Sequence, residues 1–237
     1  MAYDWQNRAT ARPAAWAEVD AGLRQYMLRV YNYMGAGLAL TGIVAYVAAA
    51  SGFYQAIYRT PIMWLVILAP LGMVFFLSFR IRSMSLGAAQ TTFWVYAGSV
   101  GLSLAGIFLV YTGLSIASTF LITAAMFLGT SLYGYTTGRD LSGVGSFMFM
   151  GLIGIVIAGL VNLFLASPAL QFAISVIGVV VFTGLTAWDT QRIKEMYVEH
   201  DDGTIAGKKA IMGALALYLD FLNLFLFMLQ FLGQRRD

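Results

Sequence analysis

The sequence predicts an all-α membrane protein, a bundle of seven transmembrane helices. Of its 237 residues, 60% are hydrophobic and only 11% are charged, and the mean hydropathy is +0.78. This composition contains too few polar residues to cover the surface of a soluble domain of the same size. Seven apolar runs, each near the roughly 20 residues that a helix needs to cross the hydrocarbon core, give the number of helices.

The predicted spans follow one another closely, so residues 29–233 are expected to form a single bundle. Short connections, such as residues 51–61 and 111–115, make consecutive helices antiparallel neighbours. The longest connection, about residues 190–209, is densely charged and is predicted to be a solvated loop with helical extensions of its neighbours. The approximate spans are 30–51, 61–79, 91–112, 115–135, 145–166, 170–190 and 210–232.

Both ends of the chain are polar. Residues 1–28 are predicted to be a tail, either an amphipathic helix on the membrane surface or a solvated segment leading into the first span. This tail lacks the apolar region and small-residue cleavage site of a secretory signal peptide. Residues 234–237 form a short basic tail.

The distribution of Lys and Arg predicts a cytoplasmic amino terminus. With seven crossings, every basic residue except Arg59, Arg235 and Arg236 falls on the side of the amino terminus. Cytoplasmic loops carry such an excess. Arg235 and Arg236 would fit this rule better if the last apolar run re-entered, but residues 210–232 are long enough to cross, and we expect them to do so.

Composition excludes several kinds of site. The absence of cysteine excludes disulfides, cysteine-ligated zinc and thiol nucleophiles, and the single histidine, His200, lies in the charged loop. No GxSxG, HExxH or P-loop motif is present. An intramembrane aspartyl protease would need two facing aspartates, but YLDFLN and AWDTQ do not resemble the YD and GLGD motifs of that class. We therefore expect neither enzymatic activity nor a cofactor.

The formal net charge of +3 does not predict a nucleic-acid partner. The basic residues flank apolar runs and form no patch with interleaved aromatic residues. They are typical of topology signals beside a lipid bilayer.

Asp189 and Asp220 are the candidate functional residues because they are acids inside apolar runs, where a carboxylate is costly. Thr183 and Thr186 share a helix face with Asp189, and Asn223 shares one with Asp220. The sixth span ends and the seventh begins on the cytoplasmic side, so the two acids are expected to approach each other there. The alternative is structural: each acid caps a helix or pairs with a basic neighbour.

Two carboxylates in close contact within a low-dielectric bundle cannot both ionise easily, so they would share a proton and act as a switch. Alternatively, a calcium ion rather than a proton would balance the charge of the two carboxylates, since Ca²⁺ binds six to eight oxygen atoms. The two carboxylates, Asn223, Thr186, carbonyls and water could supply them. Arg80 and Arg82, at the end of the second span, are candidates to pair with the acids; the alternative is that they anchor the span on the cytoplasmic side.

Several of these stretches resemble a known family. FTGLTAWDTQRIK (182–194), ALALYLDFLNLFLFMLQFLG (214–233) and SLYGYTTGRDLS (131–142) are similar to the signature of the Bax inhibitor-1 family in a bacterial version. The resemblance implies a bundle with the last helix near its centre, and a pH-sensitive Ca²⁺ leak gated by Asp189 and Asp220. It also implies a closed state in which an arginine, with Arg80 favoured over Arg82, pairs with Asp189.

The resemblance also implies an alternative function. Some bacterial members of the family bind and modulate a membrane-anchored ATP-dependent protease, a function that would use surfaces rather than the acids. The sequence thus leaves two hypotheses, a calcium leak and a protease regulator, for a multi-pass protein of the bacterial inner membrane.

Overall fold

The chain is predominantly helical. A computed structural model describes residues 4–236, with side chains described from residue 21 onward. In this part of the chain seven helical segments are long and apolar enough to cross a membrane, which confirms the predicted class. The helices are α1 (Asp4–Ala50), α2 (Phe53–Ile57), α3 (Ile62–Arg80), α4 (Leu86–Leu104), α5 (Ile107–Val110), α6 (Gly113–Thr136), α7 (Ser142–Leu165), α8 (Pro168–Glu195) and α9 (Gly203–Leu232).

Local sequence explains where four of these helices begin. Ser85, Thr112, Ser167 and Asp202 each precede a helix, and each side chain accepts a hydrogen bond from a backbone N–H of the first turn. Such caps satisfy donors that have no partner within the helix. Pro168 follows Ser167 at the first position of α8, where a missing N–H costs nothing.

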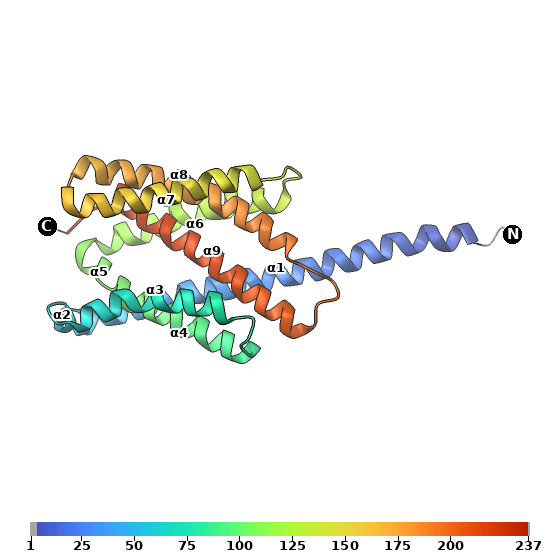
Figure 1. Cartoon of the computed structure of the whole chain (residues 1–237), viewed down its shortest axis with the longest axis horizontal. Helices are drawn as coiled ribbons and strands as arrows, with labels where there is room; N and C mark the ends of the chain where they lie inside the picture. Colours follow the sequence, from blue (N-terminus) through green and yellow to red (C-terminus); the bar gives the residue numbers. More distant parts are fainter. Residues whose placement is uncertain (1–3, 237) are drawn as a thin grey trace.

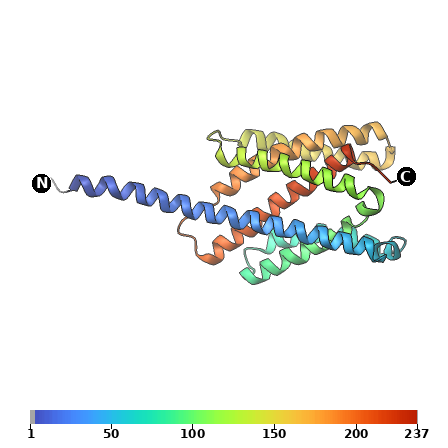
Figure 2. The ribbon, with the colours of Figure 1, turned by 180° about the vertical axis from the view of Figure 1, so that it is seen from behind.

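The helices run antiparallel between two ends of the bundle (Figure 1). We call the end with the connections 81–85, 137–141 and 196–202 the N-side, because the chain enters the bundle there. The C-side holds the connection 51–61 and the end of α9. Seen from behind, α1 crosses the bundle from one side to the other (Figure 2).

The last helix crosses the whole bundle. Residues beyond α9 pair with the α5–α6 connection on the C-side: the Arg236 N–H donates to the Val110 carbonyl at 2.9 Å, and the Thr112 N–H donates to the Gln234 carbonyl at 3.1 Å. The apolar run 210–232 therefore forms part of one continuous helix that extends from one side of the bundle to the other and does not turn back.

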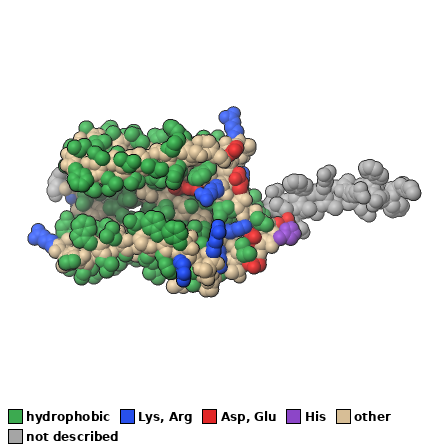
Figure 3. Space-filling model, in the orientation of Figure 1, with side chains coloured by type: hydrophobic (Ala, Val, Ile, Leu, Met, Phe, Trp, Pro, Cys, Tyr) green, Lys and Arg blue, Asp and Glu red, His purple; other side chains and the backbone are tan. Residues whose placement is uncertain are grey.

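Helix α9 is the most buried of the seven spans. In its most apolar stretch 61% of the residues are buried, compared with 39% in α8 and 6% in both α3 and α7. It packs against α1, α4, α6 and α8, and Leu217, Tyr218 and Leu224 have no exposed surface. The outer helices instead expose large apolar side chains, as expected beside lipid (Figure 3).

From Asp4 onward, the predicted tail, residues 1–28, lies on α1, which continues into the first span without interruption. Tyr26 and Met27, at the end of this tail, are buried in the core. The side chains of residues 1–20 lie outside the described part, so the amphipathic character of the tail stays a prediction. Of the predicted basic tail, Asp237 also lies outside the described residues.

Candidate functional site

Asp220 is an enclosed acid in the most buried helix. Its exposed fraction is 4%, and it is the single Asp, Glu, Lys, Arg or His among the buried residues of the described chain. Apolar residues, including Leu219 and Phe221, surround it along α9. Because α9 begins at Gly203, Asp220 lies past the middle of the helix and deeper than a span starting at residue 210 suggests. A carboxylate at this depth needs a partner or a proton.

Asp189 supplies the nearest partner. It lies on α8, the helix that α9 contacts most extensively, and its side chain is 15% exposed. The two carboxyl groups lie close enough to influence each other's charge. The structure thus brings together the two acids that the sequence singles out.

The contact between these carboxyl groups depends on a proton. Asp220 Oδ2 is buried and has no donor among the described residues. Two ionised carboxylates offer only acceptors and repel each other, whereas one shared proton turns the contact into a hydrogen bond. The two acids are therefore expected to titrate as one unit.

The basic partner of Asp189 is Arg192, one turn further along α8. Its Nη1 lies 3.9 Å from Asp189 Oδ1, and its guanidinium stacks over the Trp188 ring at 5.4 Å from the centroid. Trp188 packs against α7 where Gly145 leaves room for the indole. The Arg192 side chain is 61% exposed, so the ion pair itself is weak.

Arg80 and Arg82 are not brought to the acids. Both side chains are exposed, and neither forms an ion pair with a described residue. Arg80 ends α3, an outer helix that packs mainly against α4, whereas Asp189 faces α9. Lys208 Nζ donates to the Arg82 carbonyl at 3.3 Å. A latch formed by either arginine stays a prediction.

The side chains predicted to support the acids use their donors within their own helices. Thr186 Oγ1 donates to the Phe182 carbonyl at 2.7 Å, and Asn223 Nδ2 donates to the Leu219 carbonyl at 2.8 Å. The described residues contain no group of three or more acids or histidines that could hold a metal ion. A calcium ion at Asp189 and Asp220 would thus need carbonyl or water oxygens to complete its shell.

A chain of hydroxyl groups that was not predicted from the sequence ends at Thr190, the residue after Asp189. Tyr31 Oη lies 2.5 Å from Ser131 Oγ, which lies 3.0 Å from Thr190 Oγ1. Thr190 donates its proton to the Thr186 carbonyl at 2.8 Å, so Ser131 donates to Thr190 and Tyr31 donates to Ser131. This chain joins α1, α6 and α8. Thr186 and Thr190 are four residues apart, which places both hydroxyl groups on one face of α8. The partners of Thr190, Ser131 and Tyr31, lie far away in the sequence.

Small residues bring the helices close together, both near Asp189 and further along α8. A Cβ at Gly134 on α6 would collide with the backbone of Ala187, two residues before Asp189. A Cβ at Gly178 on α8 would meet the ring of Phe227 on α9 at 2.6 Å. Such close contacts are how membrane helices pack without a hydrophobic driving force between them.

The connection between α8 and α9 is fastened on the N-side. Lys209 Nζ lies 2.5 Å from Asp201 Oδ2 and 3.0 Å from the Met196 carbonyl. Lys209 therefore joins the first turns of α9 to the end of α8, the two helices that carry the acids.

The connection between α6 and α7 is fastened to α8 in a similar way. Gln191 accepts the Leu141 N–H and donates to the Arg139 carbonyl, both at 2.8 Å. Nearby, hydrogen bonds from Ser142 lower the pKa of the exposed Asp140 below its ordinary 3.8. Asp140 is thus ionised at neutral pH and lies apart from the buried pair.

A cavity of about 760 Å³ opens on the C-side, far from this N-side polar network. Its lining comes from α2, α4, α5 and α9, and Figure 3 shows this face hollowed between two bands of hydrophobic side chains. A smaller hollow of about 100 Å³ shares Leu104 and Ile107 with it and reaches Phe221, the residue after Asp220. Apart from Thr41, the smaller hollow is lined by apolar residues and a glycine.

Comparison with known proteins agrees with this arrangement. Residues 23–237 match the model of the family described as inhibitor of apoptosis-promoting Bax1. The inner membrane protein YbhL of Escherichia coli is 50% identical to this chain, over 91% of the chain and 94% of the relative. Uncharacterized proteins of Rickettsia prowazekii and Caulobacter vibrioides are 51% and 42% identical, over 92% and 98% of this chain and 93% and 98% of their own lengths. The chain therefore belongs to the Bax inhibitor family, as a multi-pass protein of the bacterial inner membrane.

Proposed function

We propose that the protein is a pH-sensitive, Ca²⁺-permeable leak in which the Asp189–Asp220 pair controls the open and closed arrangements. The observation that carries this proposal is the contact between the two carboxyl groups, one of them 4% exposed, at the interface of α8 and α9. With the amino terminus in the cytoplasm, the N-side is the cytoplasmic side.

Protonation changes the force between α8 and α9. With one proton the two acids attract each other and keep one negative charge, which Arg192 faces. With no proton the acids repel each other and present two charges to a cation, and with two protons the pair loses its attraction for both arginine and Ca²⁺. Protons and Ca²⁺ thus compete, and Ca²⁺ binds more weakly as the pH falls.

The path of the ion is proposed to join the C-side cavity to the pair. The linings of the cavity and of the smaller hollow at Phe221 share Leu104 and Ile107. The rings of Phe120 and Phe127 pack against Phe221 with centroids 5.3 and 5.5 Å away. An apolar constriction of this kind excludes a hydrated cation. This arrangement supports the assignment of the structure to a closed state.

Calcium flux into liposomes tests the proposal. Reconstituted protein should admit Ca²⁺ to vesicles loaded with an indicator dye, at a rate that changes with pH. Asp220→Asn should abolish the pH dependence, because an amide cannot titrate. Asp140→Asn is the matched control, since that acid is exposed outside the spans, and should behave as the wild type.

An unchanged pH profile in Asp220→Asn would overturn the proposal. Absence of flux together with co-purification of a membrane-anchored protease would instead favour the regulatory function. In that case Asp220→Asn should leave the association intact.

A further inference from the structure

The C-side cavity has the dimensions and walls of a ligand site. Its volume of about 760 Å³ falls in the range of pockets that enclose small molecules, and Ile107, Leu109, Val110 and Leu226 line one part of it. This part of the wall offers no polar side chain to an ordered water, which needs polar partners. The chemistry of these walls favours a hydrocarbon chain.

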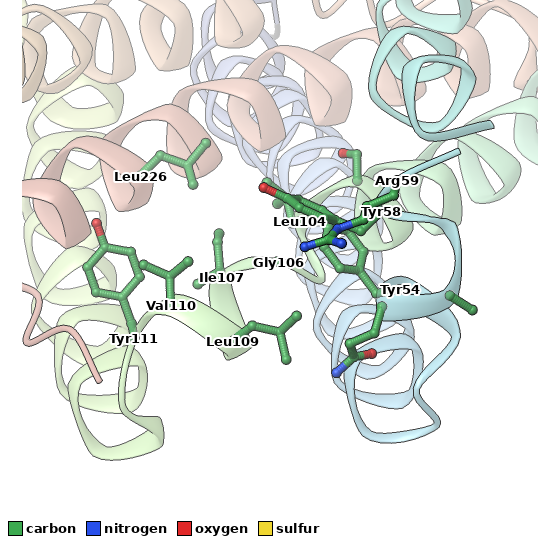
Figure 4. A pocket seen from close by; sticks show the side chains of 13 residues that line it. Tyr54, Tyr58, Arg59, Leu104, Gly106, Ile107, Leu109, Val110, Tyr111 and Leu226 are labelled. Atoms are coloured by element: carbon green, nitrogen blue, oxygen red, sulfur yellow. The ribbon is translucent and has the colours of Figure 1, made fainter. Parts of the chain in front are cut away.

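A basic and polar rim faces these apolar walls. Arg59 lies at the end of the α2 segment together with Tyr58 and Gln55, and its guanidinium reaches toward the cavity opposite Leu226 and Tyr111 (Figure 4). Arg59 is exposed and forms no ion pair with any described residue. A free guanidinium beside tyrosine and glutamine side chains is suited to a phosphate group.

The charges of the C-side favour an anion over a cation. Arg59, Arg235 and Arg236 lie on this side, and no acid is found there among residues 4–236. Arg235 forms a β-bridge with Tyr111, which lines the cavity, so the backbone of a second basic residue lies beside this region. Tyrosine and arginine beyond the end of a span are typical of the membrane interface, where lipid headgroups lie.

We infer that this cavity binds an anionic phospholipid, with the phosphate at Arg59 and an acyl chain against Leu109, Val110 and Leu226. The inference goes beyond the proposed function and does not depend on it, because the lipid site stands whether or not the protein passes Ca²⁺. A phospholipid combines the two chemistries that the walls and the rim require, and the bilayer supplies it beside the cavity.

Lipid retention measured by native mass spectrometry tests this site. The purified full chain in a neutral detergent is given equal amounts of phosphatidylglycerol and phosphatidylcholine. The wild type should retain phosphatidylglycerol preferentially. Arg59→Gln should lower that retention about fivefold and leave phosphatidylcholine unchanged, because one basic contact is lost. Arg82→Gln, which removes an exposed arginine on the N-side, is the matched control and should behave as the wild type.

Two further measurements separate the parts of the site. Val110→Trp should fill the apolar region and lower the retention of both lipids. Inorganic phosphate should not displace the lipid, because the acyl chain supplies most of the contact. Equal retention in Arg59→Gln and Arg82→Gln would overturn the inference, as would displacement by inorganic phosphate alone. Equal thermal unfolding of the variants in the same detergent shows that any difference comes from the site.

Discussion

The N-side of the bundle is closed by polar contacts, whereas the C-side surrounds a cavity. On the N-side acids and bases are mixed, and Lys209, Gln191 and Lys194 fasten the connections to α8 and α9. On the C-side the described charges are all arginines, and the helices leave a hollow of about 760 Å³. Polar contacts join α8 and α9 on both sides, since Gln230 of α9 accepts hydrogen bonds from Gln171 and Ser175 of α8 on the C-side. The two sides therefore differ in their charges and in the hollow, which leaves the C-side free to accept a ligand.

The largest effect on this comparison is expected from glycines at the two ends of α6. Gly134→Ala, near the N-side, places a methyl group against the backbone of Ala187 and should destabilise the protein by about 1–3 kcal/mol. Gly113→Ala, at the C-side end of the same helix, has nothing within 4 Å and should leave stability unchanged or slightly raised. Unfolding of both variants in mixed micelles measures the difference, and equal stabilities would show that α6 and α8 separate at no cost.

A smaller effect is expected from the lysine that fastens the α8–α9 connection. Lys209→Met removes the bonds to Asp201 and to the Met196 carbonyl and leaves a mostly buried acid unpaired, so stability should fall by about 1 kcal/mol. Arg59→Met on the C-side removes no ion pair and should change stability by less than about 0.5 kcal/mol. Amide hydrogen exchange of residues 196–209 measures directly whether the α8–α9 connection opens more often in Lys209→Met. Unaltered protection in Lys209→Met would mean that other contacts hold this connection.

The smallest effect is expected from the arginines near the pair. Arg192→Gln should change stability by less than about 1 kcal/mol, because the side chain is largely exposed. It should nevertheless shift the pH dependence of Ca²⁺ flux, since Arg192 is the base nearest to Asp189. Arg80→Gln should shift it less. If Arg80→Gln shifts the pH dependence more than Arg192→Gln, then α3 approaches the acids in another state. That result would favour Arg80 as the arginine that pairs with Asp189 in the closed state.

Much of the fold follows from composition and pattern. The seven apolar runs predict seven crossing helices because a bilayer requires about 20 apolar residues for each, and the short connections require antiparallel neighbours. The prediction of a crossing last span depended only on its length. Asp189 and Asp220 could be identified as candidates without the structure, because a carboxylate inside an apolar run is energetically costly and therefore rare.

Contacts between distant segments could not be predicted in the same way. The Tyr31–Ser131–Thr190 chain joins residues from three helices, and hydroxyl groups are common enough in spans that no local pattern marks these three. The choice of Arg192 over Arg80 beside Asp189 depends on α3 lying outside α4, which sequence does not specify.

The sequence by itself thus determined the membrane class, the number of spans and the two acids, because these depend on local chemistry measured against the thickness of a bilayer. Only the tertiary structure decided that the carboxyl groups meet, and that Asp220 Oδ2 is buried without a donor. It also decided that a cavity with Arg59 at its rim lies on the other side. These features depend on how helices distant in sequence pack and tilt against one another, which is set by close contacts such as that of Gly134 with Ala187.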